Sequence, residues 1–132
     1  MGIFKRIFGI CETKPPKDSG CWKVSDNAVE IELERAPELS EKNGAIRIEG
    51  DGLFERILVL CDNDEEFHAF INKCTHAKRR IDPVGGESVI RCCSVGKATY
   101  NYNGEVISGS AKEPLKVLQI KKEDNRIIVS LD

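Results

Sequence analysis

The sequence has no run of apolar residues that approaches the roughly 18 needed for a membrane-spanning helix. It also has little net charge. Its 20 basic and 22 acidic residues leave −2, which argues against a nucleic-acid-binding surface. It shows no Ser/His/Asp order and no glycine-rich phosphate loop. Only two histidines are present, His68 and His76, so we expect no second metal centre. These absences leave no catalytic site to assign.

A secretory signal is also missing. Residues 1–11 are apolar in character, but Lys5 and Arg6 interrupt them, so they lack the apolar centre of a signal peptide. We therefore expect a cytoplasmic protein. In a reducing cytoplasm, the six cysteines are more consistent with metal or redox chemistry than with disulfides.

The chain is predicted to consist of one domain and a short tail. With 132 residues, 40% of them apolar, it is long enough to bury a core without disulfides. Residues 1–20 form the predicted N-terminal tail, in which residues 3–8 carry an amphipathic helical stripe before two prolines and a glycine. We expect this short helix to dock on its own domain or on a partner. The alternative is a membrane surface, reached through residues 1–11. Residues 22–132 form the domain.

The domain is predicted to be a series of short β-strands. Residues 29–33 alternate apolar and acidic side chains with the period of a half-buried strand. Residues 57–60 form a fully apolar run between turn signals, as expected for a buried strand. Asn103-Gly104 predicts a two-residue hairpin in which both residues have positive φ. Further predicted strands cover residues 45–48, 67–71, 89–90, 99–102, 115–120 and 127–131. This pattern indicates an all-β antiparallel sandwich or barrel.

Cysteine and histidine gather at two places along this domain. Cys74-Thr75-His76 forms the first, and Cys92-Cys93 forms the second. Thiolate and imidazole ligands suit iron–sulfur clusters and tetrahedral zinc alike, so residue type alone leaves the metal open. The Cys92-Cys93 pair is also consistent with two small buried hydrophobes or with a strained disulfide. Cys61 ends an apolar run and is expected in the core.

The spacing of these residues is similar to the motifs of one family. Rieske [2Fe–2S] domains carry Cys-x-His followed by Cys-x-x-His, and Cys74, His76 and Cys92 stand in register with the first three ligands. Residues 103–115, Asn-Gly-Glu-Val-Ile-Ser-Gly-Ser-Ala-Lys-Glu-Pro-Leu, resemble the phrase that follows the second motif in that family. The resemblance covers residues 22–132. It implies a Rieske-like antiparallel β-sandwich or barrel with two cluster-binding hairpin loops at one end.

The resemblance implies a [2Fe–2S] cluster with an altered ligand set. Cys74 and Cys92 would hold one iron and His76 the other. Val95 stands where the family has its second histidine, and it cannot bind metal. Cys93 is the tentative substitute, giving three cysteines and one histidine, and water or a partner's side chain are the alternatives. A zinc-stabilised module and a domain without metal are the remaining alternatives for the site.

The resemblance implies electron transfer rather than catalysis by this chain. The large catalytic domain that the family often carries is not found in the sequence. We therefore expect a small ferredoxin or an accessory subunit of an oxidoreductase, with a redox protein as partner. Lys78, Arg79 and Arg80 follow the first motif and form either a solvated loop or a docking patch for an acidic partner. The rival interpretation is a cluster-free interaction subunit with the same fold.

The remaining cysteines and His68 receive structural interpretations. In the Rieske proteins of cytochrome bc complexes a disulfide bridges the two loops. The resemblance places its two positions at Arg79 and Ser94, so that bridge is not expected here. Cys11 and Cys21 are interpreted as incidental thiols, and His68 as solvent-facing or hydrogen-bonded.

Overall fold

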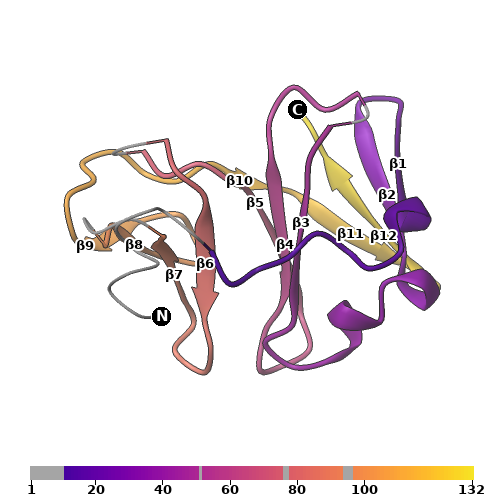
Figure 1. The fold of residues 1–132 in the computed structure, drawn as a ribbon, viewed down its shortest axis with the longest axis horizontal. Helices are drawn as coiled ribbons and strands as arrows, with labels where there is room; N and C mark the ends of the chain where they lie inside the picture. The colour runs from indigo at the N-terminus through magenta and orange to yellow at the C-terminus, as the bar shows by residue number, and fades with distance from the viewer. Residues whose placement is uncertain (1–10, 51, 76–77, 94–96) are drawn as a thin grey trace.

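The computed structural model describes residues 11–50, 52–75, 78–93 and 97–132, which fold into strands β1 to β12 (Figure 1). The strands form three four-stranded antiparallel sheets, and no α-helix occurs among the described residues. The predicted all-β antiparallel class is therefore confirmed. Within the described part of the chain, no helix is long and apolar enough to cross a membrane.

Each sheet is built from neighbouring strands that pair antiparallel. The first sheet contains, in spatial order, β1 (Trp22–Ser25), β2 (Ala28–Glu32), β12 (Arg126–Ser130) and β11 (Ile120–Glu123). The second contains β10 (Val117–Leu118), β5 (Phe67–Ile71), β4 (Ile57–Cys61) and β3 (Ala45–Ile48). The third contains β6 (Ile81–Val84), β7 (Val89–Cys92), β8 (Thr99–Asn101) and β9 (Val106–Ser108). Short 3-10 turns lie at η1 (Ser19–Cys21), η2 (Leu33–Arg35) and η3 (Pro37–Ser40).

The second sheet is the middle layer, and β4 is buried along its whole length. Ile57 and Val59 pack in a core shared with the first sheet. Leu58 and Leu60 face the other way, into a core shared with the third sheet. Each such fully buried side chain contributes about 1.5–3 kcal/mol of transfer free energy. The continuous apolar run in the sequence is therefore a strand covered on both faces.

The turns follow the sequence signals in part. Asp124 and Asn125 join β11 to β12, as the sequence indicates, and Asp124 has a φ of 53°. The predicted two-residue Asn103-Gly104 hairpin is wrong in detail, because residues 102–105 all lie between β8 and β9 and only Gly104 of the pair has positive φ. The Asn101 side-chain oxygen accepts hydrogen bonds from the backbone N–H groups of residues 103 and 105, at 2.9 and 3.0 Å. These bonds stabilise the longer loop.

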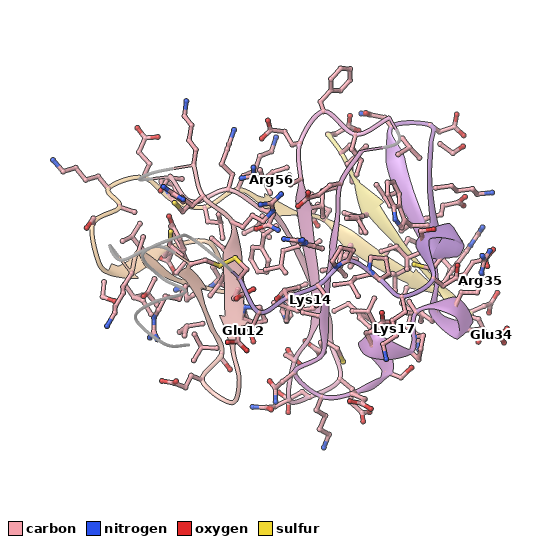
Figure 2. All side chains as sticks on the ribbon, in the orientation of Figure 1. Glu12, Lys14, Lys17, Glu34, Arg35 and Arg56 are labelled. Atoms are coloured by element: carbon pink, nitrogen blue, oxygen red, sulfur yellow. A yellow bond between two sulfur atoms is a disulfide. The ribbon has the colours of Figure 1, made fainter. Side chains whose placement is uncertain are left out.

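Residues 11–20 form an extended segment, here called the strap, that crosses the molecule from β6 towards β1 (Figure 1). Midway, the Lys14 carbonyl accepts a hydrogen bond from the Arg47 backbone N–H at 3.1 Å. At the far end, the Arg35 guanidinium donates to both carboxylate oxygens of Asp18, at 2.7 and 3.0 Å (Figure 2). The strap therefore lies on the domain. The amphipathic stripe predicted for residues 3–8 falls outside the described residues.

Gly109 lets β9 approach the segment that leads into β8. Its φ is +89°, and a Cβ there would lie 2.5 Å from the Lys97 carbonyl oxygen and 2.6 Å from the Ala98 Cα. Backbone atoms cannot yield as a flexible side chain can. We expect Gly109→Ala to lower the free energy of unfolding by about 1–3 kcal/mol, the usual cost of overpacking. Chemical denaturation measures this.

Gly85→Ala is the matched control for that substitution. A Cβ added at Gly85 would have no atom within 4 Å, so the control should leave the denaturation midpoint nearly unchanged. Equal midpoints for the two variants would show that the close approach at Gly109 does not constrain the fold.

Candidate metal centre

Two loops at one end of the third sheet bring Cys74 and Cys92 together. Cys74 lies in the loop between β5 and β6, and Cys92 is the last residue of β7. Both thiols are buried, with 0 and 1% of their surface exposed, in the same apolar core as Tyr100. Burial raises the pKa of Tyr100, and the negative charge of the Cys74 and Cys92 thiolates raises it further, although its hydrogen bonds with Thr75 act in the opposite direction. The two thiols and the Tyr100 ring thus belong to one buried cluster.

The first loop folds tightly around Cys74. Its backbone N–H donates to the Arg79 carbonyl at 2.7 Å, and its own carbonyl accepts from the Lys78 N–H at 2.9 Å. The Cys74 Sγ accepts a hydrogen bond from the Arg79 backbone N–H at 3.4 Å. The Cys74 sulfur is therefore a hydrogen-bond acceptor inside the first loop.

Tyr100 ties the first loop to the third sheet. Its hydroxyl oxygen accepts from the Thr75 backbone N–H at 2.9 Å and lies 3.0 Å from the Thr75 Oγ1. The same Oγ1 donates to the Glu113 carbonyl at 2.7 Å. Thr75 is the middle residue of the first motif, so Tyr100 fixes the residue between Cys74 and His76. The sequence pattern assigns no such role to Tyr100, because its partner is distant in the chain.

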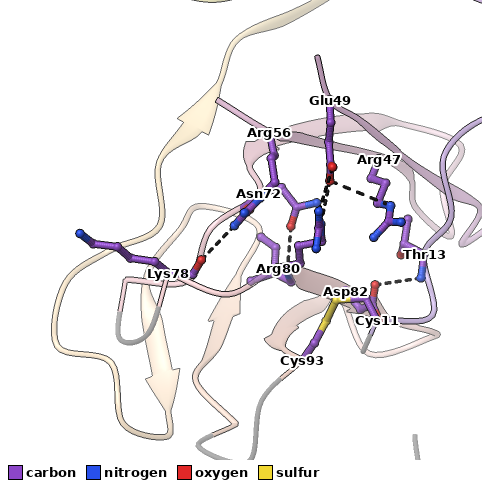
Figure 3. A network of polar contacts seen from close by, with 11 residues as sticks. Cys11, Thr13, Arg47, Glu49, Arg56, Asn72, Lys78, Arg80, Asp82 and Cys93 are labelled. Atoms are coloured by element: carbon purple, nitrogen blue, oxygen red, sulfur yellow. Dashed lines mark hydrogen bonds and ion pairs between the residues drawn. A yellow bond between two sulfur atoms is a disulfide. The ribbon is translucent and has the colours of Figure 1, made fainter. Parts of the chain in front are cut away.

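A polar network holds the outer side of the first loop (Figure 3). Arg56 donates to the carbonyls of Asn72 and Lys78 at 3.0 and 2.9 Å. Arg80 makes a two-pronged ion pair with Glu49, at 2.7 and 2.9 Å, and this pair holds the pKa of the Glu49 carboxyl below its usual value despite partial burial. Arg80 is therefore part of the loop's support, which removes it from the predicted docking patch.

The structure contradicts the tentative assignment of Cys93 as a ligand. Cys93 forms a disulfide with Cys11, with 5.4 Å between their Cα atoms. A sulfur in a disulfide is not a thiolate and cannot serve as the fourth ligand. The interpretation of Cys11 as an incidental thiol is wrong for the same reason. The sequence gives no signal for this pair, because its members are 82 residues apart.

Two of the other residues that the sequence analysis singled out lie outside the described part of the chain, and two lie within it. His76 and Val95 lie outside the described residues, so their placement stays a prediction. His68 is hydrogen-bonded, as expected: its Nε2 lies 2.8 Å from the Asp62 Oδ2, and its ring stacks on Tyr102. Cys61 is buried, as expected.

Cys21 is a free, buried thiol in the core between the first two sheets. Burial raises its pKa to about 11, and the nearby carboxylates of Asp18 and Glu38 act in the same direction. A thiol of such high pKa is a poor nucleophile and a poor metal ligand. Cys21 therefore has a packing role.

The model of the Rieske [2Fe-2S] domain family matches residues 31–119. No curated protein matches the sequence. Among solved structures, the chain is similar to the ferredoxin of carbazole 1,9a-dioxygenase from Nocardioides aromaticivorans IC177, with 17% identity and a TM-score of 0.59 over 70% of this chain and 88% of that one. It is also similar to the cyanobacterial plasma membrane Rieske protein PetC3 from Synechocystis PCC 6803, with 20% identity and a TM-score of 0.53 over 64% and 85% of the two chains.

A third similar structure is larger than this chain. The quaternary ammonium Rieske monooxygenase CntA matches with 16% identity and a TM-score of 0.57. The match covers 87% of this chain but only 34% of the monooxygenase. At these identities the three likenesses establish a common fold and no more.

Removing the Tyr100 hydroxyl should loosen the first loop. Tyr100→Phe leaves the Thr75 backbone N–H without its acceptor, which costs about 1–2 kcal/mol of unfolding free energy for a part-buried donor. Tyr102→Phe is the matched control, because Tyr102 packs on His68 and not on Thr75. Hydrogen exchange of the Thr75 amide, together with chemical denaturation, measures the effect. An unchanged exchange rate in Tyr100→Phe would contradict the assigned role.

Proposed function

Because this chain belongs to the Rieske [2Fe-2S] domain family, whose model matches residues 31–119, we propose that it transfers electrons through a [2Fe–2S] cluster with three protein ligands. The observation that carries the proposal is that two buried thiols, Cys74 in the loop between β5 and β6 and Cys92 at the end of β7, lie in one core cluster with Tyr100. Buried thiols that share one polar neighbour and a hydrogen-bonded loop suit the inner iron of such a cluster.

The residues fit the cluster in part. Cys74 and Cys92 would hold the inner iron, and His76 would hold the outer iron through a ring nitrogen. Neither of the remaining candidates fits the fourth position, because Cys93 is in a disulfide and Val95 has no donor atom. Water, or a side chain supplied by the redox partner, would complete the set. The variant ligation distinguishes this chain from the usual two-histidine pattern of the family.

The cluster would supply one-electron chemistry, and the chain's own residues would hold and shield it. The Arg79 N–H donates to the Cys74 sulfur, and hydrogen bonds to cluster sulfurs are one determinant of reduction potential. Tyr100 and Thr75 fix the first loop, and the apolar core behind the two thiols excludes water. With one histidine ligand, at most one imidazole proton can accompany the electron.

We propose that the rim of the two loops docks an acidic redox protein. Lys78 and Arg79 are exposed on the first loop, Lys97 is exposed on the second, and Lys112 is exposed beside Glu113, whose carbonyl binds Thr75. Another similar structure is a complex of reduced oxygenase and oxidised ferredoxin in carbazole 1,9a-dioxygenase. By analogy, the partner of this chain would be an oxygenase or reductase component, in the cytoplasm.

The test of the proposed function is metal and sulfide content. Protein prepared without oxygen should contain iron and acid-labile sulfide in near-equal amounts, with visible absorption. Cys74→Ser and Cys92→Ser should each abolish that absorption, whereas Cys61→Ser, at a buried thiol of the second sheet, should retain it. Stoichiometric zinc instead of iron would favour the zinc-stabilised module. Folded, colourless, metal-free protein after reconstitution would overturn electron transfer in favour of the accessory subunit.

A charge-reversal series tests the docking rim with a small probe. Oxidation of the reduced protein by ferricyanide, an anion, should slow about tenfold at low salt in the double variant Lys78→Glu/Arg79→Glu, because attractive charge raises encounter rates. Lys42→Glu/Lys122→Glu is the matched control, with the same net charge change at exposed sites on other elements. Stopped-flow rates across ionic strength measure the effect. Equal slowing in both variants would show that net charge, not the rim, governs the encounter.

A further inference from the structure

We propose that the Cys11–Cys93 disulfide is a reversible thiol–disulfide exchange site. Its reduction by a dithiol would loosen the attachment of the strap to the third sheet. The bridge joins the first described residue of the strap to the residue that directly follows β7 and Cys92. Nothing in the proposed electron transfer requires this bridge. It differs from the loop-to-loop bridge of cytochrome bc Rieske proteins, because Arg79 occupies one of the two positions that the bridge would need.

The bridge links the strap to a strongly held part of the third sheet (Figure 3). On one side, the Cys93 backbone N–H donates to the Arg80 carbonyl at 3.0 Å. On the other side, the Glu12 and Thr13 backbone N–H groups donate to the two carboxylate oxygens of Asp82, at 2.6 and 3.0 Å. Asp82 is itself buried in β6. The disulfide and the Asp82 carboxylate thus both hold the strap's first residues on the third sheet.

The strap is anchored separately at its other end. The Lys14 carbonyl accepts a hydrogen bond from the Arg47 backbone N–H. The Lys17 N–H donates to the Glu38 carboxylate at 2.9 Å. Asp18 forms an ion pair with Arg35. None of these contacts involves the third sheet. Cleavage of the disulfide leaves residues 12 and 13 held by the Asp82 carboxylate alone on that side, so it should loosen residues 11–13 and leave residues 14–20 in place. The disulfide therefore controls the end of the strap that lies next to Cys92.

A cavity of about 270 Å³ gives a reagent access to the bridge. Its lining includes Glu12, Asp82, Arg91, Cys92 and Cys93. The two bridged residues are only 7 and 1% exposed, so exchange should be slower than at an exposed disulfide. Cys93 lines this cavity and Cys11 does not, so we place the attack at the Cys93 sulfur. In the cytoplasm, cellular dithiols keep most thiols reduced, and the disulfides that do form there are usually transient or redox-sensing.

The dithiol supplies both of the electrons that reduce the Cys11–Cys93 disulfide. A reductant thiolate attacks the Cys93 Sγ, the Cys11–Cys93 bond breaks, and Cys11 leaves as a thiolate that takes a proton from solvent. The reductant's second thiolate then attacks the reductant's first sulfur in the mixed disulfide. Cys93 is released as a thiolate and takes up a proton. Two electrons pass from the dithiol to the bridge, and the reductant ends as a disulfide.

The test combines thiol trapping with hydrogen exchange on the full chain. After rapid alkylation, peptide mass spectrometry should find Cys11 linked to Cys93 in oxidised protein, and both alkylated after dithiothreitol treatment. Reduction should speed exchange of the Glu12 and Thr13 amides at least tenfold and leave the Ile31 and Ile127 amides, in the first sheet, unchanged. Removing the reductant and reoxidising should restore both the link and the protection.

Matched variants distinguish the local effect of losing the disulfide from a general loss of stability. Cys11→Ser should reproduce the fast exchange of residues 12 and 13 without reductant, whereas Cys21→Ser, at a buried free thiol, should not. Absence of the linked peptide in oxidised protein would overturn the proposal. Unchanged protection of residues 12 and 13 after reduction would also overturn it. Each readout is independent of iron content. Failure of the disulfide-exchange proposal can therefore be told apart from failure of the proposed electron transfer.

Discussion

The burial of β4 on both faces is the constraint on which the rest of the structure depends. Its alternate side chains, such as Leu58 and Val59, belong to two different cores, so the second sheet joins the first sheet to the third. Phe70 and Ala69 on β5 divide in the same way. Because the third sheet packs on this shared layer, Cys74, Cys92 and Tyr100 lie in the same core.

The candidate site is then held by polar contacts at the margin of the second core. Two polar contacts join the first loop to other elements. The Thr75–Tyr100 pair joins it to β8, and the Arg80–Glu49 pair joins it to the residue that follows β3. A hydrogen bond of this kind contributes about 0.5–1.5 kcal/mol, far less than the apolar burial beneath it. The cores therefore supply most of the stability. The polar contacts select one loop geometry out of many that the cores would tolerate.

Local patterns predicted much of the fold. The alternation of residues 29–33 gave the buried positions Val29 and Ile31, and the apolar run at residues 57–60 gave the doubly covered strand, because period and composition are local properties. The number of sheets and the order of their strands could not be predicted in this way, since these depend on contacts between distant segments.

The site shows the same division between local and distant information. Cys74 and Cys92 were predicted as ligands from motif spacing. The structure places both in one core with Tyr100, and their role as ligands stays a prediction. The Cys11–Cys93 bridge was missed because disulfide connectivity cannot be deduced from sequence alone. The expectation of a reducing compartment also turned the interpretation of Cys93 towards metal binding. Arg80 was interpreted as part of either a solvated loop or a docking patch, because its ion-pair partner, Glu49, is distant in the sequence.

The central claim is a cluster held by two buried cysteines and a single histidine. The most direct measurement is pulsed electron paramagnetic resonance of the dithionite-reduced protein, which counts the nitrogen atoms strongly coupled to the cluster. The account predicts one coupled imidazole nitrogen, from His76, and a second after Val95→His. Two coupled nitrogens in the unaltered protein, or a reduced cluster with none, would contradict it.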